Sequence, residues 1–253
     1  MKTLFDLIPN AIEENIVRDL VNLHIECLVS FLVPLEHHEG KYRLLGSGFF
    51  VYSPDPSEAV IMSARHVLEE FDYKNGRITI GTTVITPGDV GMQSLSPDVD
   101  LASWRIPADL LISSGITEVP TLPFWIPENA DEIFEPLDSF VIAGYPGSKN
   151  SHLDFREGNA PDRAIVGMAL HGSSYEQALG IRKFHYKGKV KAESWRSDMT
   201  TAPRLNGMSG SPCFRIVIHR TSGHIGIILA GVFYAWDKRK SHLFAAVYGD
   251  PWK

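Results

Sequence analysis

The segment Asn206-Gly207-Met208-Ser209-Gly210-Ser211-Pro212 has the composition of a tight turn built around a serine. A serine that attacks a carbonyl needs backbone N–H groups that point at the oxygen on which negative charge develops. Glycines on both sides of Ser209 allow the backbone angles that such a turn requires. We therefore predict Ser209 as a nucleophile and the N–H groups of Gly207 and Ser209 as an oxyanion hole. Taken alone, the segment could equally be a Gly- and Ser-rich loop between two strands.

Two further residues are of the types that a serine nucleophile needs as partners. His66 follows the apolar run Ala-Val-Ile-Met-Ser-Ala-Arg, where a base at the end of a strand could face a cleft. Asp100 opens another apolar strand, where its carboxylate could accept the Nδ1 proton of a histidine. Such a histidine alone is more often structural, and such an aspartate is more often a turn residue or a cap. The order His66, Asp100, Ser209 along the chain is, however, the order of the triad in chymotrypsin-type enzymes.

The same residues argue against other hydrolytic sites. An α/β-hydrolase has the order Ser, Asp, His and a glycine two residues after the serine, where this chain has Ser211. His-Glu-x-x-His and paired Cys-x-x-Cys spacings are absent from the sequence, and His37-His38 has no obvious third ligand. We therefore expect neither a metal nor a cofactor.

The elements that must position these residues are short and apolar. Runs rich in Val, Ile, Phe and Tyr alternate with Gly, Pro, Asn and Asp, which is typical of strands joined by turns. An i, i+4 spacing of Ile and Leu within residues 1–23 predicts a short N-terminal helix. Little other helix is expected, which favours an all-β fold over a βαβ arrangement. The predicted strands are residues 25–35, 42–52, 59–63, 77–85, 99–106, 140–145, 164–170, 182–193, 213–219, 225–233 and 242–248.

We predict that these strands form two six-stranded antiparallel β-barrels. The Pro-rich stretch TEVPTLPFWIPENADEIFEP near the middle of the chain is the best candidate for a connection between two domains. The predicted organisation is an N-terminal helical segment (1–23), a first barrel with His66 and Asp100 (24–115), a linker (116–137) and a second barrel with Ser209 (138–253).

Composition limits the partners and the compartment. A net charge of −6 without a long basic run argues against nucleic-acid binding. No stretch approaches the roughly 18 uncharged apolar residues of a membrane span. Asp6 interrupts the N-terminal apolar run, so we expect no secretory signal. Cys27 and Cys213 are too few for a disulfide framework, so we expect free, buried thiols and a cytoplasmic protein.

Together these segments resemble the trypsin-like (chymotrypsin-fold) serine peptidases, in particular the bacterial branch that includes the glutamyl endopeptidases. Residues 63–66 are similar to the family segment that ends in the catalytic histidine, and residues 100–102 to its Asp-Ile/Leu-Ala segment. Residues 207–212 are similar to its Gly-x-Ser-Gly-Gly/Ser-Pro box, and residues 143–147 to its Gly-Tyr-Pro segment. The resemblance runs from about residue 25 to residue 248. It implies a serine endopeptidase that works through an acyl-enzyme at Ser209.

The resemblance also implies where substrate binds. In this family the pocket lies between the segment before the nucleophile, here Pro203, and a strand that follows a glycine, here Phe233-Tyr234-Ala235-Trp236. Pro203 stands where recognition of Arg or Lys needs a carboxylate, and Tyr234 and Trp236 would make the pocket walls apolar. Because an unpaired substrate charge is costly there, we expect cleavage after small or medium apolar residues.

Two questions about function stay open at this point. The partner we expect is a protein or peptide substrate, but an intracellular protease also needs restraint. A regulatory protein that orders the oxyanion loop is therefore a second possible partner. The alternative is a catalytically silent protease fold that serves as a binding module. The complete triad argues against this alternative, because without catalysis the three residues would have no shared reason to persist.

Overall fold

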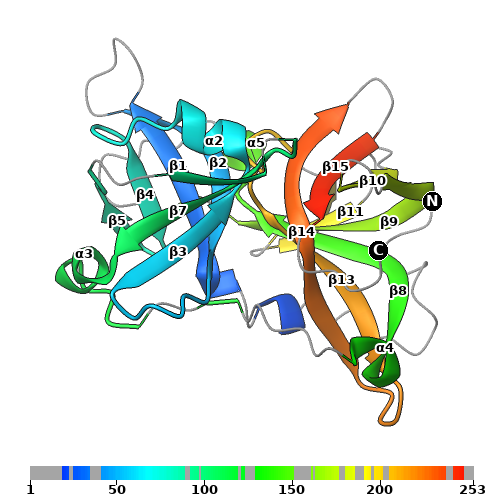
Figure 1. Cartoon of the computed structure of the whole chain (residues 1–253). Coiled ribbons are helices and arrows are strands. Elements are labelled where there is room, and N and C mark those ends of the chain that lie inside the picture. The colour runs from blue at the N-terminus through cyan, green and yellow to red at the C-terminus, as the bar shows by residue number, and fades with distance from the viewer. Residues whose placement is uncertain are drawn as a thin grey trace.

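The computed structural model describes residues 19–22, 25–34, 41–88, 92–96, 98–118, 121–122, 129–150, 161, 163–176, 180–185, 191–194, 197–201, 205–237 and 242–247. In these residues the chain forms two antiparallel β-sheets that lie side by side as two lobes (Figure 1). Residues 19–22 are helical, and most of the predicted N-terminal segment 1–23 lies outside the described residues.

The first sheet has seven strands in the order β5-β4-β1-β2-β3-β7-β6. A short 3-10 helix (Ile25–Cys27) leads into β1, helix α2 (Arg65–Glu70) follows β3, and helix α3 (Ala108–Ser113) follows β7. The strands are β1 (Leu28–Pro34), β2 (Tyr42–Val51), β3 (Glu58–Ser63), β4 (Arg77–Ile80), β5 (Thr83–Ile85), β6 (Met92–Ser96) and β7 (Leu101–Pro107).

The second sheet has eight strands in the order β10-β15-β14-β13-β8-β9-β11-β12. Strand β9 also pairs with β10, so that six strands follow one another in a ring of pairings from which β11 and β12 extend. Helix α4 (Ala130–Ile133) precedes β8, and helix α5 (Gly147–Asn150) follows it. The strands are β8 (Phe134–Gly144), β9 (Ala164–Glu176), β10 (Ile181–His185), β11 (Lys191–Ser194), β12 (Ser197–Thr201), β13 (Pro212–His219), β14 (Ile225–Asp237) and β15 (His242–Val247).

Apolar side chains pack on both faces of β2, and those on one face join the two lobes. Phe49 and Phe50 are fully buried and point to opposite faces, as successive strand residues do. Phe50 packs in a cluster of the first lobe that includes Trp104. Phe49 packs in a cluster shared by both sheets, to which the second sheet contributes Phe214. A third cluster, around Phe140, fills the second lobe.

The all-β class agrees with the prediction, but two closed six-stranded barrels do not describe the sheets. Among the described residues, the first sheet has seven strands with no pairing between its two edges, and the second has eight, of which β11 and β12 lie outside the ring of six. The sequences of β6 (MQSLS) and β12 (SDMTT) are too polar to give a hydrophobic strand signal. The predicted strand 77–85 is two strands, because Gly81 at φ 59° makes a tight turn between β4 and β5.

The limits of the predicted domains stay predictions. Strands of the first sheet lie between residues 28 and 107, and strands of the second lie between 134 and 247. The predicted linker 116–137 contains α4 and the first residues of β8. Within it, Leu122 forms an isolated parallel bridge with Val51 at the end of β2.

The two cysteines are buried and form no disulfide with each other, as predicted. Cys27 belongs to the cluster shared by the two sheets, and Cys213 belongs to the cluster inside the second lobe. Burial raises the pKa of the Cys27 thiol, so the reactive thiolate is disfavoured there.

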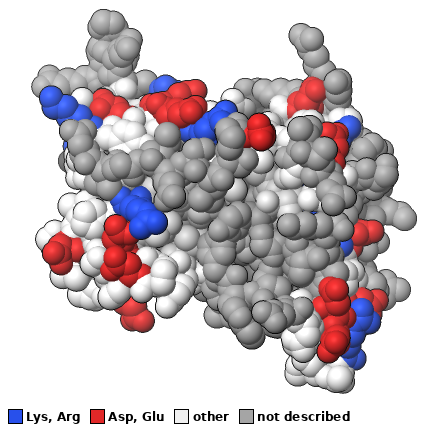
Figure 2. All heavy atoms as spheres, viewed as in Figure 1, with Lys and Arg blue, Asp and Glu red and all other residues white. Residues whose placement is uncertain are grey.

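The described surface carries mixed charge. Figure 2 shows Lys and Arg side chains interspersed with Asp and Glu over the coloured part of one face. No described helix combines the length and the apolar character needed to cross a membrane.

Candidate active site

Strand pairing brings His66 next to Asp100. Strands β3 and β7 run antiparallel with Ser63 opposite Ala102, so the end of β3 lies beside the start of β7. The backbone N–H of His66 donates to Oδ1 of Asp100 at 2.9 Å. The ring atom Nδ1 lies 2.5 Å from Oδ2 of the same carboxylate. Two hydrogen bonds therefore join residues that are 34 positions apart in the chain.

The sequence predicted His66 at the end of a strand. The structure places it in the first turn of α2 instead. The first N–H groups of a helix have no acceptor within the helix and need one from elsewhere. Ala64 stands at the N-cap and supplies no side-chain cap. The Asp100 carboxylate takes the His66 N–H instead. One carboxylate thus caps the helix and orients the ring that the helix carries.

The pair shifts the pKa of each partner. The pKa of His66 is raised from 6.5, chiefly by the hydrogen bond to Asp100, against an opposing effect of burial. For Asp100, burial is the largest single effect and raises the pKa, but the hydrogen bonds from the His66 ring and backbone outweigh it. The net pKa of Asp100 is lowered from 3.8. Asp100 is therefore the anionic partner at neutral pH, and it favours the protonated form of His66.

Two glycines shape the turn that carries Ser209. Gly207 has φ 84° and Gly210 has φ 90°, the left-handed region that residues with a Cβ rarely adopt. A Cβ on Gly210 would lie 1.9 Å from the backbone oxygen of Ser47 on β2. The second glycine is thus required both by its backbone angle and by the close approach of the first sheet.

The four backbone carbonyls from Asn206 to Ser209 each accept a hydrogen bond from within the chain. The donors come from three places: β2 of the first sheet, the segment after β8, and the turn itself. The bonds are Gly147 N–H to Asn206 O (2.5 Å), Ser47 Oγ–H to Gly207 O (2.8 Å), Ser211 N–H to Met208 O (2.9 Å) and Ser47 N–H to Ser209 O (2.7 Å). Because the N–H of a trans peptide points away from its C=O, these bonds also set the directions of the N–H groups.

From Gly207 to Gly210, N–H groups with an acceptor alternate with N–H groups that have none among the described residues. Met208 N–H donates to Leu205 O at 3.0 Å, and Gly210 N–H donates to Phe233 O at 2.7 Å. The N–H groups of Gly207 and Ser209 have no acceptor among the described residues. The carbonyls of the same two peptides, Asn206 O and Met208 O, accept hydrogen bonds on the opposite side, so both N–H groups are directed away from the donors that anchor the turn. The turn therefore presents two adjacent donors, the arrangement that an oxyanion hole needs.

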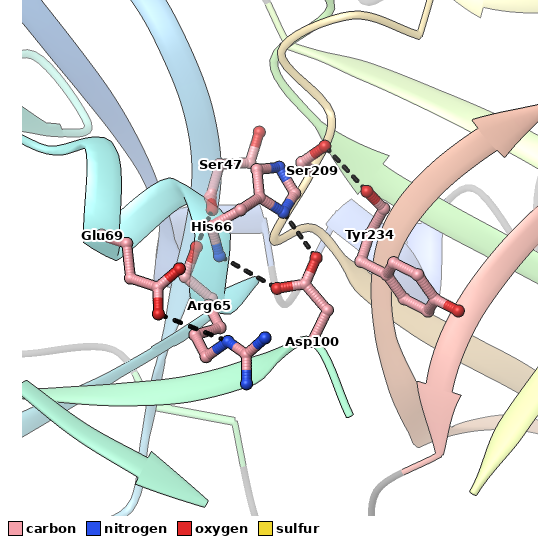
Figure 3. A network of polar contacts seen from close by, with 8 residues as sticks. Ser47, Arg65, His66, Glu69, Asp100, Ser209 and Tyr234 are labelled. Carbon is pink, nitrogen blue, oxygen red and sulfur yellow. Dashed lines mark hydrogen bonds and ion pairs between the residues drawn. The ribbon is translucent and has the colours of Figure 1, made fainter. Parts of the chain in front are cut away.

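The Ser209 hydroxyl lies near the backbone of Tyr234 and the ring of His66 (Figure 3). It donates to the backbone oxygen of Tyr234 on β14 at 3.1 Å. Figure 3 shows the edge of the His66 ring that is not bonded to Asp100 turned toward Ser209. No hydrogen bond joins His66 to Ser209 among these described side chains. The structure thus brings His66, Asp100 and Ser209 to one place, with the serine proton donated to the strand.

The residues predicted to bind substrate have different surroundings. Phe233 is buried in the core of the second lobe, and Trp236 packs against that core. The Tyr234 carbonyl faces Ser209, while its ring points away from the site (Figure 3). Ala235 is partly buried on the same strand, and Pro203 lies outside the described residues. The pairing of β14 with β13 ends at Val232, whereas its pairing with β15 continues to Asp237.

Sequence reasoning missed the residues that anchor the turn from outside. Ser47 belongs to the motif Gly46-Ser47-Gly48, which indicated only a strand. Gly147 belongs to a segment that was noted for its resemblance alone. A small polar residue between two glycines was the available signal, but it does not say which distant carbonyl the hydroxyl reaches.

In the described part of the chain, no group of three His, Cys, Asp or Glu residues could hold a metal ion.

The sequence matches no protein-family model and no curated protein. Solved structures that the chain resembles are proteases. The inactive form of the Mycobacterium tuberculosis protease Rv3671c has a TM-score of 0.44 and 17% identity, covering 96% of this chain and 93% of that chain. For the Vibrio cholerae VesB protease the TM-score is 0.48 and the identity 13%, covering 88% of this chain and 61% of that chain.

The tobacco etch virus protease, complexed with product, has a TM-score of 0.45 and 13% identity, covering 89% of this chain and 74% of that chain. At these identities and TM-scores the chain is not assigned to a family. The resemblance to the glutamyl endopeptidase branch stays a prediction, and the chemistry of the site is inferred from its own residues.

Proposed function

We propose that this protein is a serine endopeptidase with His66, Asp100 and Ser209 as its catalytic triad. The observation that carries the proposal is the turn around Ser209. The carbonyls from Asn206 to Ser209 each accept a hydrogen bond, while the N–H groups of Gly207 and Ser209 have no acceptor among the described residues. The His66–Asp100 pair beside this turn supplies the base that a serine nucleophile requires.

The proposed reaction has two halves. Ser209 Oγ attacks a peptide carbonyl while Nε2 of His66 takes the hydroxyl proton, and the N–H groups of Gly207 and Ser209 bind the oxyanion. His66 then gives its proton to the leaving amine, and the acyl group stays on Ser209. A water molecule, deprotonated by His66, attacks the acyl-enzyme and releases the acid. Asp100 keeps the ring in the tautomer with Nε2 free to accept a proton, and it stabilises the imidazolium.

We further propose that substrate lies along β14 near Ser209. Phe233 bonds through its N–H and C=O to Ser211 and Gly210 of the turn. Beyond Phe233 this side of β14 carries no further strand among the described residues, so an extended peptide could add there. Cleavage after small or medium apolar residues stays a proposal from the sequence, because the Tyr234 ring points away from Ser209 (Figure 3) and Trp236 packs against the core. Cys27 and Cys213 form no disulfide with each other, which is compatible with a reducing, cytoplasmic setting.

One observation favours the second candidate, a catalytically silent binding module. The Ser209 hydroxyl donates to Tyr234 O rather than to His66, so the nucleophile is not engaged with its base. A third arrangement, a regulatory partner that orders the oxyanion turn, has less support, because the turn already has its anchors within the chain. A partner that acts on the Ser209 side chain is compatible with the same contacts.

Labelling with a fluorophosphonate, which reacts with activated serines, separates the two candidates. We expect a stoichiometric adduct that mass spectrometry locates on Ser209. Ser209→Ala should abolish both the adduct and hydrolysis of a peptide library, while far-UV circular dichroism stays unchanged. His66→Ala should lose activity comparably, since triad residues act as a unit.

Ser211→Ala is the matched control. Ser211 is the other serine of the turn, and its buried hydroxyl has no hydrogen-bond partner among the described residues. Its backbone N–H remains in the variant. Labelling of Ser211→Ala should match that of the wild type. An unlabelled, folded wild-type protein would instead support the silent module, and an adduct that persists in Ser209→Ala would remove Ser209 from the site.

A further inference from the structure

The buried serine on β2, Ser47, makes hydrogen bonds with every polar group it has. Its hydroxyl donates to Gly207 O at 2.8 Å and accepts from Tyr145 N–H at 3.1 Å. Its N–H donates to Ser209 O at 2.7 Å, and its own carbonyl accepts from the hydroxyl of Ser63 at 2.7 Å. The residue is fully buried. Ser47 thus joins the first sheet to two different parts of the second lobe.

The position of Ser47 within the sheet explains these contacts. Pairing between β2 and β3 begins at Gly48 opposite Ser63, one residue after Ser47. The edge of β2 that faces β3 is therefore no longer covered by β3 at Ser47. The nucleophile turn occupies this place, and its Ser209 carbonyl takes the N–H of Ser47.

The two bonds from Ser47 fix alternate peptide planes of the turn. The hydroxyl holds the peptide that follows Gly207, and the N–H holds the peptide that follows Ser209. The proposed oxyanion donors, Gly207 N–H and Ser209 N–H, belong to the peptides directly before and directly after the one that the hydroxyl holds. Gly207, at φ 84°, has no Cβ to restrict rotation, so an external anchor has to select one orientation.

The close approach of the two sheets leaves little room for another arrangement. A Cβ on Gly144 would lie 3.0 Å from the Ser47 hydroxyl oxygen, and a Cβ on Gly210 would lie 1.9 Å from the Ser47 carbonyl oxygen. The glycines around Ser47 therefore allow the contact that lets its hydroxyl reach Gly207 O.

We propose that Ser47 is a positioning residue, which keeps the Gly207 and Ser209 N–H groups directed at the substrate oxyanion. This inference rests on the proposed peptidase function. Without the Ser47 hydroxyl, the partly buried Gly207 carbonyl and the buried Tyr145 N–H both lose their partner, and the peptide after Gly207 is free to rotate. Among the described residues, no hydrogen bond or ion pair joins His66 or Asp100 to Ser47, so the pair should keep its pKa values.

Ser47→Ala tests the proposal, with Ser30→Ala as its matched control. Ser30 stands opposite Ser47 on β1, is equally buried, and bonds to Thr79 instead of the turn. We expect Ser47→Ala to slow fluorophosphonate labelling of Ser209 by about 10²-fold, the effect of losing one oxyanion donor. The midpoint of the labelling rate against pH should not move. Ser30→Ala should lower the melting temperature comparably but label at the wild-type rate.

A second readout does not depend on activity. The ¹⁵N–¹H signal of Gly207 should shift or broaden in Ser47→Ala and stay in place in Ser30→Ala. If Ser47→Ala fails to fold, Ser47→Cys, which keeps the size of the side chain and a weak donor, should show the same changes to a smaller extent.

Three outcomes would overturn the inference. The first is labelling of Ser47→Ala within about threefold of the wild type, since the loss of an oxyanion donor has a far larger effect. The second is equal slowing in Ser30→Ala, which would indicate general destabilisation. The third is an unchanged Gly207 signal in Ser47→Ala. If the wild type itself is not labelled, the proposed peptidase function fails, and the Gly207 signal alone then decides whether Ser47 anchors the turn.

Discussion

Replacing Asp100 with asparagine should disable the site while leaving its size and shape nearly unchanged. In the wild type, one carboxylate accepts two hydrogen bonds from His66, at 2.9 Å from the backbone and 2.5 Å from Nδ1. An asparagine has one acceptor oxygen and one NH₂ donor. If the oxygen keeps the backbone N–H, the NH₂ group faces Nδ1 and requires it to be an acceptor. The ring proton then stands on Nε2, which can no longer take the proton of Ser209.

The expected loss is about 10⁴-fold in the maximal labelling rate, the size of effect that a wrong histidine tautomer produces. The pH dependence should change as well. His66 must be neutral to act as a base, and its pKa is raised above 6.5 by Asp100, so wild-type labelling should rise with pH through a midpoint above 6.5. In Asp100→Asn the anionic partner is gone, so the midpoint should move to lower pH.

The assay is the initial rate of fluorophosphonate labelling between pH 5 and 9, with the His66 pKa followed by NMR. Asp98→Asn is the control, because Asp98 lies two residues away and carries the same substitution. Its rate should stay within about threefold of the wild type, as for most surface changes. A mild Asp100→Asn and a crippling Asp98→Asn would refute the assignment of the carboxylate.

Three further predictions use the same protein. Gly207→Ala should slow labelling by about 10²-fold, because φ is 84° there and a Cβ would lie 2.8 Å from a backbone oxygen; a wild-type rate would contradict the oxyanion turn. The pair of His66 and Asp100 should add most stability between pH 3.8 and 6.5, with losses as pH falls through the lowered pKa of Asp100 or rises through the raised pKa of His66. Urea unfolding of the wild type and Asp100→Asn across pH measures this difference, and a constant difference would speak against it. Cys27 and Cys213 should react with a thiol reagent only after denaturation, and a disulfide between them in native protein would contradict the structure.

The residue types of the site could be selected from the sequence because their requirements are local. A serine nucleophile needs a turn with left-handed angles, and such angles favour glycine at Gly207 and Gly210. Apolar runs before His66 and after Asp100 indicated two strands, and β3 and β7 lie there. Antiparallel pairing of these strands then brings the two residues together, which no local pattern could state.

Other elements left no local signal. Strand β6 is held by its pairing with β7, and its polar sequence does not alternate in hydrophobicity. The short helix α2 has no side-chain cap of its own, and its start depends on a carboxylate from Asp100. Both elements exist because of partners that are distant along the chain.

By itself, the sequence determined the all-β class, the order of His66, Asp100 and Ser209, and the glycines that permit the turn. These follow from side-chain shape, hydrophobicity and backbone freedom, which are properties of short segments. Only the tertiary structure decided where the hydrogen bonds of the turn go. Ser47 reaches Gly207 O across 160 positions of sequence, and the direction of each peptide depends on such partners, because a glycine-rich turn has no preferred orientation of its own.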